Sequence, residues 1–145
     1  MKTLTFKIEI QAPREKVWSV LWEDASYRKW TGVFCEGSYA ISDWEEGGFV
    51  QFLTPNGEGM HSIIEKKIEN EYMVFRHLNM VRNYEVLPVD TATQEWVGAM
   101  ETYRLTAGNG ITVLEATIDT DEKYIDHFNT AFSKALALIK ELSEE

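Results

Sequence analysis

An acidic residue, Glu101, interrupts an apolar alternation in the second half of the chain. The residues that share its expected face are Val97, Ala99, Tyr103 and Leu105. Alternation with period two is typical of a strand with one buried face, so this carboxylate is expected to point inward. A buried carboxylate is costly unless it is paired. Glu101 is therefore interpreted either as a group that orients a ligand or acts as a general base, or as a structural partner of Arg76 or His77.

Two histidines lie on predicted strands of the same region. His77 shares its expected inward face with Met73 and Phe75, and His61 lies on the preceding strand. An inward histidine can shuttle protons, or it can be a core residue held by hydrogen bonds. With Glu101 the two histidines could in principle form a two-histidine, one-carboxylate metal site. Because the three show no local ligand spacing, we predict neither a metal nor any other cofactor.

The aromatic content is high, with 5 Trp, 6 Tyr and 7 Phe. Rings carry a large apolar area on few rotatable bonds, which suits both cores and pocket walls. We predict a ligand-binding cavity lined by Trp18, Trp30, Trp44, His61, His77, Glu101, Tyr103, Tyr124, Phe128 and Phe132. The alternative is that each ring is an ordinary core residue. Because three of the rings crowd the first half of the last predicted helix, the mouth of the cavity is expected there.

Other catalytic chemistry finds no support in the sequence. There is no G-x-S-x-G nucleophile elbow. The Gly57-x-Gly59 pair lacks the following helix that would supply donors to a phosphate. Cys35 is the single cysteine. It falls on a predicted strand, where we expect a small buried apolar residue and not a reactive thiolate.

The elements that position these residues begin with a strand and two helices. Residues 3–10 alternate polar and apolar side chains, as expected for a strand with one buried face. Pro13 suits the first position of a helix, and apolar residues at helical spacing follow it. Asp24 can cap a second short helix, and Gly32 can end that helix.

The remainder of the chain is predicted to be strands followed by one long helix. Turn signals such as Gly108-Asn109-Gly110 separate the strands, and Ile64 and Ile68 are expected on one face of the same strand. Residues 124–142 place apolar side chains at every third or fourth position, which indicates an amphipathic helix. The order of strand, two short helices, about six strands and long helix favours an α+β fold, in one domain spanning 1–145.

The charge balance limits the classes of partner. The net charge is −10, from 14 basic and 24 acidic residues, whereas binding to nucleic acid or to an anionic membrane surface needs a basic footprint. The first residues alternate and do not form the apolar block of a signal peptide, and no apolar run reaches the ~18 residues that span a bilayer. We therefore predict a cytoplasmic protein with neither nucleic acid nor membrane as a partner. A homodimer is compatible with a small domain that exposes a sheet edge.

Two local motifs resemble the START-like superfamily, also called SRPBCC. The first is Ile8-x-Ile10-x-Ala12-Pro13-x-x-Lys16-Val17-Trp18-x-x-Leu21, which resembles the opening of that superfamily's bacterial members. The second is Trp96-x-Gly98-Ala99-Met100-Glu101-x-Tyr103-x-Leu105, which is similar to the branch named after the activator of the heat-shock-protein-90 ATPase. The resemblance covers essentially the whole chain.

The resemblance implies a helix-grip fold, in which a curved antiparallel sheet of about seven strands and a long C-terminal helix enclose an apolar cavity. It implies no single function, because one fold hosts many activities. Our first hypothesis is non-enzymatic binding of a small lipophilic or aromatic molecule. The alternative is an enzyme of the cyclase or hydratase type that uses Glu101, His77 or Tyr103. A chaperone-interacting module ranks last, because the eukaryotic activators carry a further N-terminal domain that these 145 residues do not contain.

Overall fold

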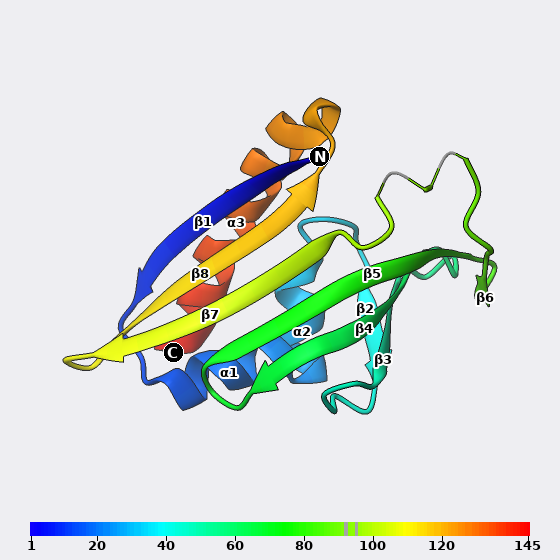
Figure 1. The fold of residues 1–145 in the computed structure, drawn as a ribbon. Coiled ribbons are helices and arrows are strands. Elements are labelled where there is room, and N and C mark those ends of the chain that lie inside the picture. Colours follow the sequence, from blue (N-terminus) through cyan, green and yellow to red (C-terminus); the bar gives the residue numbers. More distant parts are fainter. Residues whose placement is uncertain (92, 95) are drawn as a thin grey trace.

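The computed structural model describes residues 1–91, 93–94 and 96–145 (Figure 1). In chain order the elements are β1 (Lys2–Ile10), α1 (Arg14–Trp22), α2 (Asp24–Thr31), β2 (Tyr39–Ser42), β3 (Phe49–Leu53), β4 (Gly59–Ile68), β5 (Tyr72–Arg82), β6 (Glu85–Val86), β7 (Met100–Gly108), β8 (Ile111–Thr120), the 3₁₀-helix η1 (Glu122–Tyr124) and α3 (Ile125–Glu144). The predicted α+β class and element order are confirmed.

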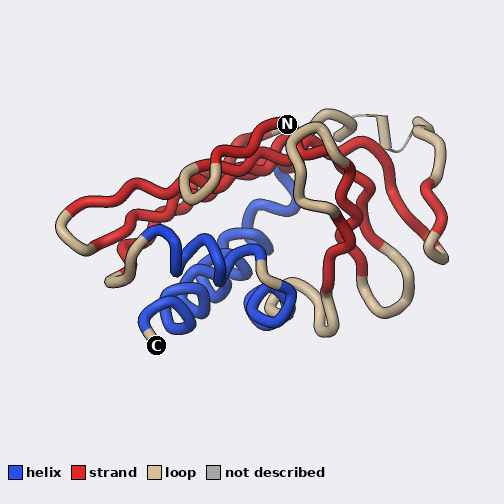
Figure 2. Tube along the Cα trace, turned by 90° about the horizontal axis from the view of Figure 1, so that it is seen from below, coloured by secondary structure: helices blue, strands red, loops and turns tan. Residues whose placement is uncertain are grey.

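The strands form one antiparallel sheet that curves around the helices. Its order is β1-β8-β7-β5-β4-β3-β2, and the short β6 pairs with β5 outside this path. Figure 2 shows the sheet bending over the helical layer, so that its concave face looks toward α3 and α2. Helix α3 contacts β1, α1 and α2. This arrangement leaves the strands β2 to β5 facing the first turns of α3 across the concavity.

The two ends of the chain adopt the structures that their patterns predict. In β1 the side chains alternate between exposed and partly or fully buried, because every second residue faces the helices. In α3 the buried residues are Ala131, Phe132, Ala135, Leu136, Ile139 and Ser143. They recur at helical spacing and pack α3 into the core from Ala131 onward. No helix in the described part of the chain is both long and apolar enough to cross a membrane.

Irregularities in the pairing of β4 with β5 decide which side chains face inward. Register shifts occur between His61 and Ser62 and between Ile64 and Lys66. An extra residue at a bulge reverses the alternation beyond it. Ile64 is fully buried, whereas Ile68 is 39% exposed. The expectation that both lie on one face is therefore wrong.

Two other boundaries differ from the sequence prediction. The strand expected to begin at Trp96 begins at Met100, because Gly98 adopts a φ of 89° and Ala99 N–H donates to the Trp96 carbonyl in a turn. Helix α2 begins after Glu23, and Asp24 lies in its first turn rather than at its cap. Cys35 is exposed and lies in the turns between α2 and β2, so the prediction of a buried strand residue is also wrong.

Candidate functional site

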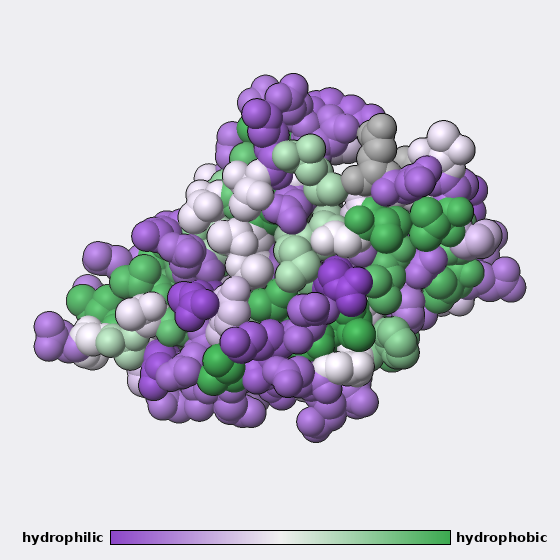
Figure 3. All heavy atoms as spheres, viewed as in Figure 1, coloured by the Kyte–Doolittle hydropathy of each residue, from purple (hydrophilic) through white to green (hydrophobic). Residues whose placement is uncertain are grey.

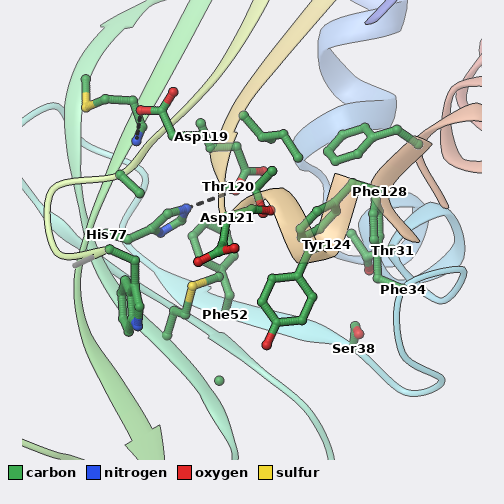
Figure 4. A pocket seen from close by; sticks show the side chains of 18 of the residues that line it. Thr31, Phe34, Ser38, Phe52, His77, Asp119, Thr120, Asp121, Tyr124 and Phe128 are labelled. Carbon is green, nitrogen blue, oxygen red and sulfur yellow. Dashed lines mark hydrogen bonds and ion pairs between the residues drawn. The ribbon is translucent and has the colours of Figure 1, made fainter. Parts of the chain in front are cut away.

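A cavity of about 860 Å³ lies between the concave face of the sheet, η1 and the first half of α3. Its size is within the usual range for small-molecule sites. Aromatic residues supply much of the wall: Tyr27, Trp30, Phe34, Tyr39, Phe52, Trp96, Tyr103, Tyr124, Phe128 and Phe132. Figure 4 shows Tyr124 and Phe128 from the helical side facing Phe52 and His77 from the sheet side. The wall is thus apolar around a few polar groups.

The polar groups on the sheet side form one connected set. Nε2 of His77 lies 3.2 Å from Oε1 of Glu101, and the hydroxyl of Tyr103 donates a short hydrogen bond to Oε2 of the same carboxylate. Nδ1 of His77 lies 2.6 Å from Oγ of Ser62. We call Ser62, His77, Glu101 and Tyr103 the polar relay. It spans three strands and faces the cavity through Glu101 and His77.

Strand register brings the polar relay together. Ser62 of β4 stands opposite His77 of β5, and Glu101 of β7 stands opposite Phe75 of β5. Because alternate residues of a strand share a face, His77 and Tyr103 follow Phe75 and Glu101 on the concave side. The β5–β7 pairing continues past the strand end, since His77 N–H donates to the Ala99 carbonyl at 2.9 Å. The histidine backbone is therefore fixed on both sides.

The residues of the polar relay differ in how accessible they are from the cavity. Ser62 is fully buried, and Tyr103 is 1% exposed. The side chains of His77 and Glu101 retain 9% and 20% exposure. Ser62 can orient the imidazole through Nδ1, but it is not accessible as a nucleophile. Glu101 is the group of the relay that a ligand can reach most easily.

Burial beside Glu101 also keeps two phenols protonated. Desolvation raises the pKa of Tyr103 well above its ordinary value, and the Glu101 charge and the hydrogen bond to it act in the same direction. Desolvation, followed by the Glu101 charge, raises the pKa of Tyr27. Both phenols remain hydrogen-bond donors across the physiological range, because ionising either would bury a second negative charge beside the carboxylate.

A cluster of packed rings supports the floor of the cavity. Trp22 lies at its centre, with ring centroids 6.1 Å from Trp18 and 5.6 Å from Trp44. The ring of Tyr103 lies 5.1 Å from Trp22. Most of these contacts are edge-on, an arrangement that aromatic pairs favour. The ring cluster therefore holds Tyr103, and through it Glu101, in a fixed position.

No protein-family model and no curated protein matches the sequence significantly. The chain is similar in structure to the Aha1 dimer from Colwellia psychrerythraea, with a TM-score of 0.74 and 20% identity over 99% of this chain and 97% of that chain. It is similar to MLL2253 from Mesorhizobium loti, with a TM-score of 0.75 and 13% identity over 97% and 96%. It is also similar to CalU16 from Micromonospora echinospora, with a TM-score of 0.67 and 16% identity over 97% and 75%.

The chain has a helix-grip fold. The fold that the sequence resemblance implied is therefore confirmed, and one of the matched structures carries the Aha1 name of the branch that the second motif resembles. Identities of 20% and below establish the fold alone, because one fold hosts many activities.

The helix-grip cavity brings together seven of the ten predicted site residues. The residues that line it are Trp30, His77, Glu101, Tyr103, Tyr124, Phe128 and Phe132. Phe132 is 3% exposed and stacks on Phe6 with centroids 4.8 Å apart, so it belongs to both the core and the wall. Phe128 is partly buried. Tyr124 is 48% exposed, which places it at the mouth.

The other three predicted residues lie away from the cavity wall. Trp18 and Trp44 belong to the ring cluster under the floor. His61 stacks on the exposed ring of Phe49 at 4.9 Å, because its neighbour Ser62 occupies the inward position. His61 therefore does not meet His77 and Glu101. Within the residues that the structure describes, no group of three His, Cys, Asp or Glu side chains is arranged to hold a metal ion.

Several residues of the site were not predicted from the sequence, and Phe52 and Ser62 show why. Phe52 lies in the segment Phe49-Val50-Gln51-Phe52-Leu53, where apolar residues occur at both parities, so alternation could not assign its face. In the structure its ring lies 6.1 Å from that of His77. Ser62 carried no signal on its own, since its role depends on the strand register. A small polar residue within an apolar strand was the available hint.

Proposed function

We propose that this protein binds a small lipophilic or aromatic molecule in the helix-grip cavity. The observation that carries the proposal is a cavity of about 860 Å³ that combines aromatic walls with a single polar relay. Sites for small molecules are usually concave, mostly apolar and furnished with a few polar groups that set orientation. The rings would supply most of the affinity, and Glu101 and His77 would select the polar end of the ligand.

The proposal can be tested with the fluorescent probe N-phenyl-1-naphthylamine. Its emission is expected to rise saturably on titration with the protein. At about 100 times the dissociation constant, it should stabilise the fold by roughly 2.7 kcal/mol, which raises the melting temperature by about 5–10 °C. No saturable signal and no thermal shift, with this probe and with a diverse lipophilic library, would contradict the proposal.

A matched pair of variants separates cavity binding from binding to the surface. Phe128→Ala removes a partly buried ring from the cavity wall and is expected to weaken probe binding at least fivefold. Phe49→Ala removes a ring that is 56% exposed and does not line the cavity, and it should leave probe binding unchanged. Equal effects of the two variants would show that the probe binds elsewhere.

A second candidate function is acid–base catalysis of the cyclase or hydratase type. The observation that favours it is the convergence of His77, Glu101 and Tyr103 within hydrogen-bond reach in one cavity. Glu101 would act as a general base toward a carbon acid next to a carbonyl, and a phenol or imidazole would donate to the carbonyl oxygen. Deuterium exchange at the α-carbon of 1-tetralone, followed by NMR, tests this candidate. Exchange no faster than with Glu101→Gln would rule out catalysis on this substrate class.

A further inference from the structure

The charged groups of the cavity are distributed unevenly between its rim and its inner wall. The lining residues include four carboxylates, of Glu101, Asp119, Asp121 and Glu122, two side-chain ammonium groups, of Lys2 and Lys123, and Met1. We propose that the ligand carries a cationic amine, which binds beside the carboxylate of Glu101. This inference rests on the proposed binding function and specifies the chemical class of the ligand.

Both lysines are engaged at the rim. Nζ of Lys2 lies 3.6 Å from Oε1 of Glu122, and both side chains are more than half exposed. Nζ of Lys123 lies 5.2 Å from the ring centroid of Tyr124, at the mouth. In Figure 3 hydrophilic side chains gather around the N-terminal end of α3, where this rim lies. Both lysines therefore have partners at the rim, and the group of the protein that pairs with Glu101 is His77.

The rim carboxylates have partners within the protein. Asp119 accepts hydrogen bonds from the Thr3 hydroxyl and from Met100 N–H. Asp121 accepts from Lys123 N–H at the start of η1. These groups have structural roles, since they hold strand and helix ends together. Among the described lining carboxylates, Glu101 is the one that accepts a hydrogen bond from a buried phenol of the cavity wall, Tyr103.

Glu101 has acceptor capacity left for a ligand. One oxygen faces His77 and the other accepts from Tyr103. A carboxylate has about four acceptor sites, so each oxygen can accept one more hydrogen bond. His77 is less available as a donor to an anionic ligand, because Nε2 faces Glu101 and Nδ1 faces Ser62. Within the polar relay, the remaining capacity is therefore for accepting hydrogen bonds.

The surroundings of Glu101 also favour a positively charged ligand group. The faces of aromatic rings attract cations, and Tyr27, Trp30 and Phe52 line the same cavity as Glu101. Electrostatic attraction is stronger in an enclosed apolar site than in water. The net charge of −10 also attracts cations from solution. An ammonium group on an aromatic or lipophilic body matches all these features.

A charge series on one ring system tests the proposal by calorimetry at pH 7. The ligands are 2-(1-naphthyl)ethylamine, 2-(1-naphthyl)ethanol and 1-naphthylacetate, which share a shape and differ in charge. The amine is expected to bind about tenfold more tightly than the alcohol, the ratio that one charge-assisted hydrogen bond supplies. The acetate is expected to bind most weakly. Equal affinities, or the order reversed, would overturn the proposal.

Two variants assign the preference to Glu101. Glu101→Gln keeps the size of the side chain and removes its charge, so the amine should lose its advantage over the alcohol. Glu65→Gln makes the same change where the carboxylate pairs with Arg76 outside the cavity lining, and the preference should persist. If Glu101→Gln does not fold, Tyr103→Phe replaces it. That variant leaves the carboxylate charged and frees one acceptor site, so the amine preference should be retained or increased, and its loss would overturn the proposal.

The outcomes separate this inference from the proposed function. Binding of N-phenyl-1-naphthylamine with no preference for the amine would leave the cavity function intact and refute the cationic ligand. An amine preference that survives in Glu101→Gln would also refute it, because the charge would then act elsewhere. Failure of the probe and of all three naphthalene ligands to bind would refute both.

Discussion

Tyr103→Phe is expected to lower the free energy of unfolding by about 2 kcal/mol. The phenol is 1% exposed and donates to the carboxylate of Glu101. A hydrogen bond to a charged group contributes about 1.5–3 kcal/mol. Glu101 keeps His77 as a partner and has access to the cavity, so a value in the middle of that range is expected. At roughly 2–4 °C per kcal/mol, the melting temperature should fall by about 4–8 °C.

A double-mutant cycle isolates the contribution of this hydrogen bond. Urea denaturation of Tyr103→Phe, Glu101→Leu and the double variant should give a coupling free energy of about 1.5 kcal/mol, since each single change removes one partner of the same bond. Tyr72→Phe is the matched control. The guanidinium carbon of Arg104 lies 3.9 Å from the centroid of the Tyr72 ring. The free energy of unfolding of Tyr72→Phe should therefore stay within about 0.5 kcal/mol of the unsubstituted protein. If the effects of the two single cavity variants on the free energy of unfolding add to within about 0.5 kcal/mol in the double variant, the expected coupling is refuted.

Three further outcomes follow from burial. The raised pKa values of Tyr27 and Tyr103 predict that these phenols stay protonated in the folded chain above pH 10, where unfolded phenols ionise. Stability should then be retained below about pH 10 and lost as the pH rises further. Ultraviolet titration should show both phenols ionising only on unfolding, and ionisation of all 6 tyrosines in the folded protein would contradict this. Phe132→Ala should lower the free energy of unfolding, measured by urea denaturation, by about 3–5 kcal/mol, because the ring is 3% exposed. A loss below about 1 kcal/mol would show that this ring is not part of the core. Cys35 is exposed, so a thiol reagent should modify it in the native state as fast as in urea, and strong native protection would contradict its placement.

The alternation of polar and apolar residues predicted the inward-facing side chains correctly where one face of a strand is clearly apolar. The sequence predicted that His77 shares the inward face with Met73 and Phe75, and the structure buries all three. It also predicted that Glu101 lies on the face of Ala99 and Tyr103, which line the cavity with it. These side chains could be assigned because period two is a local property of the strand.

Alternation failed where strand pairing is irregular or both faces are apolar. The bulges between β4 and β5 turn Ile68 outward, and nothing in the local sequence marks them. Ring type also did not separate wall from core. Trp18 and Trp30 both follow helical spacing, yet Trp30 lines the cavity, whereas Trp18 packs against Trp22 beneath it.

The sequence by itself determined the α+β class and the long C-terminal helix. These features depend on periodicity and turn chemistry within short segments, which any reader of the sequence can follow. Only the tertiary structure decided that Ser62, His77 and Glu101 meet in one connected polar relay. Their contacts join three strands across separations of 15 and 24 residues in the sequence, and they depend on register, which bulges and long-range packing set together.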